Sequence, residues 1–150
     1  MMKIDKEYLL EQARLLFEED LYEEVNLLYS QVDSQLNDVD DLRRYSYCLI
    51  EIGDYERALS IMLDWESMEK NNPVLYSMKA HVLKKVGDLL GAEKALNKSI
   101  QIKPRASGYC VLGDLLRMMG KNEAAQGCYR AALRIDPSYK EAYMALEDMP

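Results

Sequence analysis

The chain has 150 residues, of which 49% are hydrophobic, and it carries a net charge of −7. This length suits one compact domain or a short array of repeats. The acidic balance provides no overall basic surface for nucleic acid or an anionic membrane, and no uncharged apolar run approaches the ~20 residues that span a bilayer. We therefore expect neither a nucleic acid nor a membrane as a partner.

The amino terminus and the cysteines indicate the compartment. Acidic side chains at Asp5 and Glu7 precede any apolar run, which argues against a secretory signal. The three cysteines are an odd number and form no C-x-x-C pair, so they do not suit a disulfide framework. We expect a location in the cytoplasm or nucleus, where each cysteine acts as a small hydrophobic residue.

Apolar residues at helical spacing predict nine helices. Pro73 opens the fifth, at a position where its missing N–H costs nothing. The ninth is short and is expected to turn Tyr143 and Leu146 inward, covering the open end of the helical array. In chain order the helices are predicted at about residues 5–18, 22–36, 39–52, 55–69, 73–86, 89–102, 106–119, 122–135 and 138–147.

Glycines at the turns between these helices recur at a nearly constant interval. Gly53, Gly87 and Gly120 are 34 and 33 residues apart, and each is followed five positions later by alanine. One step earlier in the chain, Asp20 and Val25 occupy the equivalent positions. A period of this length predicts helix pairs that bury their apolar faces by stacking on the next pair. We expect a single array over residues 1–150, with repeats at about 6–38, 39–72, 73–105 and 106–139.

The last repeat has the most regular pattern. Its anchors are Tyr109, Leu112, Gly113, Leu116, Gly120, Ala125, Tyr129, Ala132 and Pro137. At these offsets they resemble the 34-residue tetratricopeptide repeat (TPR), whose pattern is W-x-x-L-G-x-x-Y, then A-x-x-x-F, then P. Gly113 and Ala132 are expected to be small because two helices cross closely there. The resemblance implies an all-α fold: a right-handed superhelical TPR solenoid of four helix–turn–helix repeats and a short carboxy-terminal capping helix.

The resemblance also implies that partners bind on a concave face, lined mainly by the first helix of each repeat. Helical periodicity places on that face Arg14, Arg43, Tyr47, His81, Lys84, Asp114 and Arg117. Most of the charged members are cationic, although the chain is acidic overall. One interpretation is a solvated face. The other is a groove for an extended or helical peptide with acidic residues and an apolar anchor.

One mode of peptide binding in this family can be tested on the sequence. Relatives that hold chaperone tails by a carboxylate clamp use Lys, Asn, Asn, Lys and Arg at five groove positions. If repeats two to four formed the clamp, those positions would hold Arg43, Tyr47, Met78, Ser107 and Val111. At most one of the five is compatible, so we do not expect the clamp.

No catalytic or metal-binding constellation accompanies these residues. His81 is the only histidine, and no acid or thiol lies three or four residues from it. A general base needs an orienting partner, and a zinc site needs four nitrogen, sulfur or oxygen ligands. We expect no enzyme activity, no cofactor and no metal, with His81 either lining the groove or simply packed.

The first helix is richer in apolar residues than an outermost helix needs. Leu9, Ala13 and Leu16 suffice for the internal stack, which leaves Leu10 and Phe17 directed toward the groove. Exposed apolar residues of this size indicate a partner. The alternative is an insoluble edge, and we favour a partner that covers Leu10 and Phe17.

The degenerate opening repeat and the closing pattern resemble a narrower group. That pattern reads Leu112-Gly113-Asp114, Gly127-Cys128-Tyr129-Arg130 and Asp136-Pro137-Ser138-Tyr139-Lys140-Glu141-Ala142. It is similar to the amino-terminal domain of the TPR scaffold subunits of the anaphase-promoting complex, which serve cell division and ubiquitin conjugation and dimerise through amino-terminal repeats. This resemblance implies a non-enzymatic scaffold that contacts other subunits of a larger assembly. It also implies a homodimer, whose interface we expect to include Leu10 and Phe17. Two alternatives stay open: a bacterial type III secretion chaperone, and a generic assembly adaptor that binds a peptide in the groove.

Overall fold

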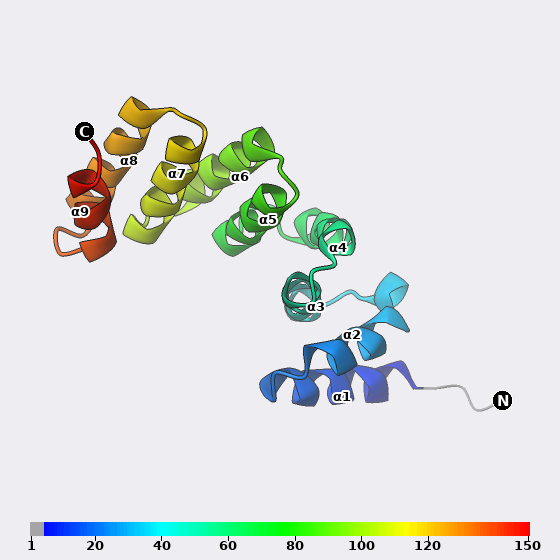
Figure 1. The fold of residues 1–150 in the computed structure, drawn as a ribbon. Helices are drawn as coiled ribbons and strands as arrows, with labels where there is room; N and C mark the ends of the chain where they lie inside the picture. Colours follow the sequence, from blue (N-terminus) through cyan, green and yellow to red (C-terminus); the bar gives the residue numbers. More distant parts are fainter. Residues whose placement is uncertain (1–4) are drawn as a thin grey trace. The chain divides into compact units, whose positions relative to one another are not determined.

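The structure, a computed structural model, describes residues 5–150. Within this range the chain forms nine α-helices and one 3-10 helix, Asp33–Gln35, with no β-strand (Figure 1). Residues 1–4 lie outside the described part. They begin the amino-terminal segment that we expect, from the sequence, not to be a secretory signal. The α-helices are α1 (Lys6–Glu18), α2 (Tyr22–Ser30), α3 (Val39–Glu51), α4 (Tyr55–Met68), α5 (Pro73–Lys85), α6 (Leu89–Ile102), α7 (Ala106–Met118), α8 (Asn122–Ile135) and α9 (Lys140–Glu147).

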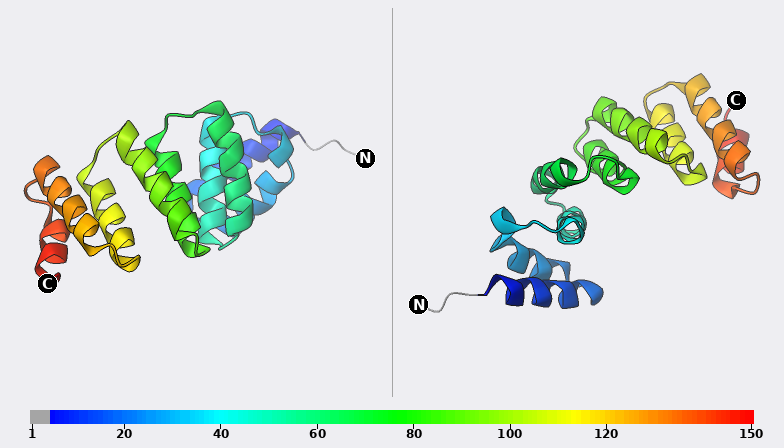
Figure 2. Two further views of the ribbon diagram at one scale, coloured as in Figure 1. Left: turned by 90° about the horizontal axis from the view of Figure 1, so that it is seen from above. Right: turned by 180° about the vertical axis from the view of Figure 1, so that it is seen from behind.

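The described residues divide into two compact units, one ending at Lys70 and the other running from Asn71 to Pro150. In the first unit α1 packs on α2, α2 on α3 and α3 on α4; in the second, α5 to α9 pack in the same consecutive order. Figures 1 and 2 show the helices of each pair side by side. Within each unit, inner helices therefore bury one face against the preceding helix and another against the following one, as stacked helix pairs require.

The turn inside each helix pair holds one residue in the left-handed conformation. Gly53, Gly87 and Gly120 have φ angles of 82°, 87° and 77°, and Asp20 has a φ of 59° at the equivalent place in the first pair. Glycine adopts this conformation without strain, and aspartate is one of the few other residues that tolerate it. In all four turns the next N–H donates to the carbonyl five residues earlier, at 2.8 to 3.1 Å. This bond ends the first helix and reverses the chain, so the predicted turn cadence is confirmed.

Helix α2 ends at Ser30, earlier than its predicted limit near residue 36. Val32, Asp33 and Ser34 follow it, and β-branched and short polar side chains favour turns over helix interiors. The Asp33 carboxylate also accepts a 2.6 Å hydrogen bond from Arg57 of α4. The chain therefore leaves the helix early and ties the 3-10 turn to a later helix of the same unit.

The inward direction predicted for Tyr143 on α9 is wrong. Tyr143 is 51% exposed, whereas the neighbouring Ala142 is completely buried. Ala142, Ala145, Leu146 and Met149 form the stripe that packs on the core of the second unit. These residues follow the i, i+3, i+4, i+7 spacing of one helix face, and the next residue after Ala142 is rotated about 100° away from that face.

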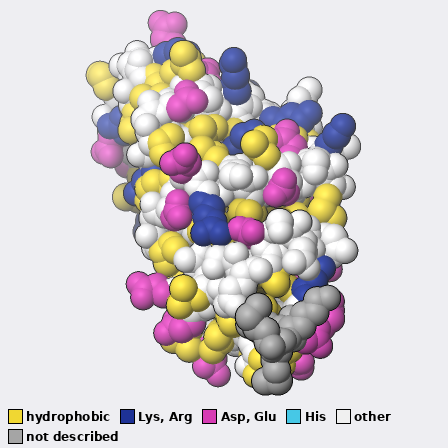
Figure 3. All heavy atoms as spheres, turned by 90° about the vertical axis from the view of Figure 1, so that its right-hand side faces the viewer, with side chains coloured by type: hydrophobic (Ala, Val, Ile, Leu, Met, Phe, Trp, Pro, Cys, Tyr) yellow, Lys and Arg dark blue, Asp and Glu magenta, His cyan; other side chains and the backbone are white. Residues whose placement is uncertain are grey.

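Surface charge does not concentrate on one side of the molecule in the view of Figure 3, where acidic and basic side chains are interspersed with apolar ones. Charges of both signs in close proximity do not produce the extended positive potential that nucleic acid binding requires. Among the described helices, none is both long enough and apolar enough to cross a bilayer.

Helices α7 and α8 approach each other closely at Gly113. A Cβ atom at this position would lie 2.7 Å from the Tyr129 ring of α8. Tyr129 is completely buried, and its hydroxyl donates a 2.6 Å hydrogen bond to Asp114. The ring is therefore held on both sides and cannot move to admit a larger residue. This contact explains the absence of a side chain at residue 113.

We expect Gly113→Ala to destabilise the chain by about 1–3 kcal/mol, because overpacking against the fixed ring outweighs the gain in helix propensity. Gly127→Ala is the matched control, since nothing lies within 4 Å of the added Cβ in helix α8. That variant should gain about 0.5–1 kcal/mol. Urea unfolding followed by circular dichroism measures both. Equal effects of the two substitutions would contradict the close helix crossing.

Candidate functional site

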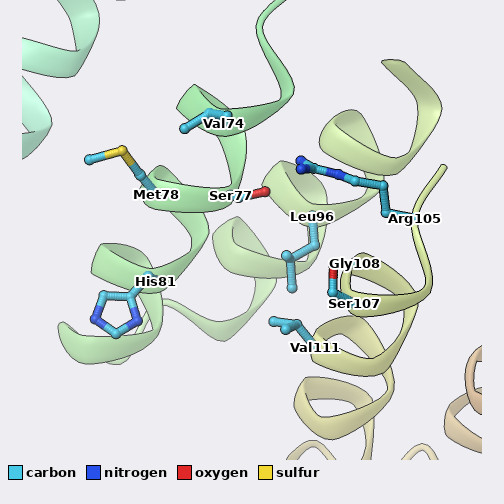
Figure 4. Close-up of a pocket in the computed structure, with 9 residues that line it drawn as sticks. All are labelled: Val74, Ser77, Met78, His81, Leu96, Arg105, Ser107, Gly108 and Val111. Carbon is cyan, nitrogen blue, oxygen red and sulfur yellow. The ribbon is translucent and has the colours of Figure 1, made fainter. Parts of the chain in front are cut away.

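An open pocket of about 410 Å³ lies in the second unit, between α5, α6 and α7 (Figure 4). Helix α5 supplies four of its residues at the spacing of one helix face, and Leu96 of α6 contributes between α5 and α7. The remaining residues come from the first turns of α7 and the residue before it. The lining is Val74, Ser77, Met78, His81, Leu96, Arg105, Ser107, Gly108 and Val111.

A second, smaller pocket of about 60 Å³ adjoins the first. It shares Ser77, His81, Leu96 and Val111 with the larger pocket and adds Ala80, Lys84, Ala92 and Leu115. We call the two together the α5–α7 trough. Small residues on α5, α6 and α7 create it, because longer side chains at these positions would fill the space between the helices.

The cations of the trough have no acidic partner. Within residues 5–150 the guanidinium of Arg105 and the ammonium of Lys84 make neither a hydrogen bond nor an ion pair with another side chain, and no Asp or Glu lines either pocket. Arg105 is half-buried, and in Figure 4 it reaches across the pocket toward Ser77 and Leu96. A half-buried guanidinium without a counter-ion is suited to bind a carboxylate.

Ser77 is oriented as an acceptor toward the trough. Its hydroxyl lies 2.8 Å from the Ser99 hydroxyl, and Ser99 donates its own proton to the carbonyl of Pro73 at 2.8 Å. Ser77 must therefore donate to Ser99, which leaves the lone pairs of the Ser77 oxygen available. An N–H group of a bound chain can use them.

Of the residues predicted for the groove, His81 and Lys84 come together in the α5–α7 trough. Asp114 and Arg117 lie on α7 but line neither pocket, and Asp114 accepts the hydrogen bond from Tyr129. Arg105, which stands just before α7, was not predicted, because helical periodicity assigns a face only to residues inside a helix. The basic run Lys103-Pro104-Arg105 at that turn was the available signal.

In the first unit, the aromatic residues predicted for the groove and the dimer interface meet in one cluster. The rings of Phe17 and Tyr47 lie 5.8 Å apart, and both contact Tyr22 at 5.9 and 5.5 Å between ring centres. Tyr47 remains 39% exposed. Arg43 is also exposed and pairs with Asp40 at 2.9 Å. Whether these residues bind a peptide stays a prediction.

Leu10 does not fit the role predicted for it. It is only 4% exposed, so its side chain belongs to the packed interior of the first unit and cannot supply an exposed apolar contact. The exposed apolar residues of α1 are Tyr8 and Leu15, each 58% exposed. Their separation of seven residues places them on one stripe of the helix.

Arg14 is not a free cation either. It donates two hydrogen bonds, of 3.0 and 2.6 Å, to the carboxylate of Asp41, which is completely buried. Tyr29 donates a third bond of 2.8 Å to the same carboxylate. Burial by itself would raise the pKa of Asp41, but the bonds from Arg14 and Tyr29 outweigh it and hold that pKa below its ordinary value. Arg14 thus compensates a buried charge that ties α1 and α2 to α3.

Two of the three cysteines, Cys48 and Cys110, are buried. Burial raises the pKa of Cys48 to about 12 and that of Cys110 to about 11, so both thiols are protonated and unreactive near neutral pH. No group of three or more His, Cys, Asp or Glu side chains in residues 5–150 is placed to hold a metal ion.

One known protein family matches part of the second unit. Residues 74–105 and 106–139 match the tetratricopeptide repeat family. A TPR repeat-containing protein of Methanocaldococcus jannaschii is 27% identical to the chain over 115 residues, which are 77% of this chain and 20% of that protein. The chain thus spans about a fifth of the length of this relative.

Solved TPR structures share the fold. The MamA protein superimposes with a TM-score of 0.83 at 17% identity, covering 94% of this chain and 78% of MamA. The first TPR domain of Spaghetti (RPAP3), bound to the HSP90 peptide SRMEEVD, superimposes with a TM-score of 0.66 at 21% identity, covering 73% of this chain and 87% of that one. The predicted all-α TPR fold is confirmed.

Asp41 and the two residues that donate to it, Arg14 and Tyr29, form what we call the Asp41 cluster, which leads to a stability prediction. Asp41→Asn should destabilise the chain by about 2–3 kcal/mol at neutral pH, somewhat less than a fully buried ion pair, because Arg14 is 41% exposed and can be hydrated. Because the pKa of Asp41 is lowered on folding, its contribution is complete above its unfolded pKa, near 3.8, and is lost as the pH falls through the folded pKa. Urea unfolding at pH 7 and below pH 3.8 measures this loss.

Asp40→Asn is the matched control for that prediction, since Asp40 is 60% exposed. A surface substitution of this kind should change the free energy of unfolding by less than about 0.5 kcal/mol. If Asp41→Asn were as mild as Asp40→Asn at pH 7, the Asp41 cluster would not stabilise the first unit.

Proposed function

We propose that this chain is a protein-interaction module that holds a peptide segment of a partner protein in the α5–α7 trough. The observation that carries the proposal is an open trough with apolar residues along it and two cations that have no partner within the described residues. Apolar surface in a concave site supplies affinity, and a few placed polar groups supply orientation. Proteins of the TPR fold are generally non-enzymatic interaction scaffolds.

The chemistry of the trough supports binding over catalysis. His81 is the only histidine that lines it, and no carboxylate or thiol lines the walls to orient or accompany it. The trough can instead pair acidic groups with Arg105 and Lys84 and cover apolar side chains along Leu96 and Val111. A peptide with acidic residues and an apolar anchor has this composition.

A structural neighbour supports a peptide as the class of ligand. The TPR domain of Spaghetti holds a peptide with two adjacent glutamates, a valine and an aspartate near its end. By their positions in the sequence, Met78, Ser107 and Val111 stand where a carboxylate clamp formed by repeats two to four would need Asn, Lys and Arg. We therefore propose an acidic peptide that is held by different contacts, from Arg105 and Lys84.

Filling the pocket tests this function. Val111 is 50% exposed on α7, so Val111→Trp can occupy the pocket without disturbing the core. We expect random heptapeptides selected on the wild-type chain to bind the Val111→Trp variant at least about tenfold more weakly, measured by calorimetric titration. Met118→Trp is the control on the same helix, because Met118 is 58% exposed and outside the trough. Selection of no peptide, or equal binding to all three proteins, would contradict the proposal.

We also propose that the chain forms a homodimer through α1, as the similarity to anaphase-promoting complex scaffold subunits implies. The exposed stripe of Tyr8 and Leu15 supports this, since large apolar side chains exposed along one side of a helix mark a surface that another protein covers. A second copy can cover the stripe on both chains at once, because a two-fold interface uses the same residues twice. Leu10, being buried, has no part in this interface.

Light scattering at micromolar concentration tests the dimer. The wild-type chain should have twice the mass of a single chain, and Tyr8→Glu combined with Leu15→Glu should be monomeric, because two buried carboxylates on each chain oppose association. Leu27→Glu is the control, since Leu27 is 64% exposed on α2 and lies outside the stripe. A monomeric wild-type chain would contradict the proposed homodimer. It would also contradict the mode of assembly that the similarity to anaphase-promoting complex subunits implies.

A further inference from the structure

The α5–α7 trough has a defined length. Val74 lines one end and Lys84 the other, ten residues apart on α5. At ~1.5 Å of rise per residue the distance between them along the helix is about 15 Å. Figure 4 shows Arg105 at the same end as Val74, with His81 toward the opposite end. Lys84 follows His81 by one helical turn.

The charges and apolar surfaces of the trough alternate along this length. A forked guanidinium stands at the Val74 end, and an ammonium stands at the Lys84 end. Leu96 and Val111 lie between them, because both line the larger and the smaller pocket. A ligand that fits this order has an anion, an apolar group and a second anion along about 15 Å.

An extended peptide meets this geometry with one particular spacing. Its side chains at positions i, i+2 and i+4 point to the same side, and ~3.3 Å of rise per residue separates the first from the last by about 13 Å. A helical peptide with the same spacing covers only about 6 Å. Resting on the peptide-binding function proposed above, we propose that the trough selects extended segments with the order acid–x–apolar–x–acid. Arg105 binds one acid, Lys84 the other, and the apolar side chain lies over Leu96 and Val111.

The two cations should contribute unequally. Arg105 is half-buried and its planar guanidinium can hold a carboxylate through two parallel hydrogen bonds. Lys84 is exposed, and its ammonium acts as a hydrated point charge. Ser77 lies between these ends and can accept a hydrogen bond from a peptide N–H. The end of the peptide that meets Arg105 therefore determines most of the selectivity.

Synthetic peptides test the spacing. The probe is a fluorescent seven-residue peptide with glutamate at its second and sixth positions, leucine at its fourth and serine elsewhere, measured by fluorescence anisotropy at low salt. We expect it to bind at least about fivefold more tightly than a peptide of the same composition with adjacent glutamates, because the latter can pair with only one cation. Replacing the leucine by serine should weaken binding by a similar factor.

Protein variants test the pairing. Arg105→Gln should weaken binding of the probe peptide about five- to tenfold, and Lys84→Ala should weaken it about two- to fivefold. Arg134→Gln on α8 and Lys94→Ala on α6 are the matched controls, because both side chains are exposed and outside the trough. Neither control should alter binding. Since Arg105 and Lys84 make no side-chain bonds to other described residues, all four variants should keep the wild-type circular dichroism spectrum.

A charge reversal identifies the end that each cation holds. The Arg105→Glu variant should no longer bind the probe. It should instead bind a peptide in which one of the two glutamates is replaced by lysine. The peptide in which the other glutamate is replaced should not bind. Restoration by neither peptide would overturn the pairing of Arg105. Equal binding of the spaced and adjacent-glutamate peptides would overturn the spacing. If the probe fails while randomly selected peptides bind in a way that Val111→Trp abolishes, this inference is wrong and the proposed function stands.

Discussion

The reversal of the chain inside each helix pair is the constraint on which the rest of the structure depends. A residue with positive φ at positions 20, 53, 87 and 120 stops the first helix and sends the second back along it. The N–H that follows each of these residues closes the end of the first helix by bonding the carbonyl five residues earlier. Because the second helix then lies against the first, the residues at the crossing must be small, and Gly113 against the Tyr129 ring shows how little space remains.

Two cations of the first unit have acidic partners, whereas the two cations that border the trough of the second unit have none among the described residues. In the first unit Arg14 forms an ion pair with Asp41, and Arg57 forms an ion pair with Asp33. A buried carboxylate such as Asp41 requires this compensation, because an isolated charge in the interior is costly. In the second unit, Arg105 and Lys84 border a trough that contains no acid. The proposed binding of an acidic partner therefore rests on the second unit, where cations without a partner among the described residues lie beside apolar surface.

The trough itself is a consequence of side-chain size. Ser77, Ala80 and Gly108 leave space between helices that would otherwise be filled, and Leu96 closes the space from α6. The apolar residues exposed along it, such as Val111, contribute little to the core. Residues of this kind are free to serve recognition, since replacing them does not create a cavity in the interior.

The sequence by itself determined the helices, the turns and the fold class, because these depend on local periodicity and on the backbone preferences of glycine and aspartate. It also placed His81 and Lys84 on a common helix face, since helical spacing is enough to do so. Only the tertiary structure decided which side chains remain available. Leu10, expected to be exposed, is buried, and Tyr143, expected to be buried, is exposed. Helical periodicity gives the spacing of a face but not which neighbouring helices cover it. Arg14 acquired a buried partner 27 residues away, and Arg105 met residues of α5 across α6. Such contacts join residues distant in the chain, and local patterns carry no information about them.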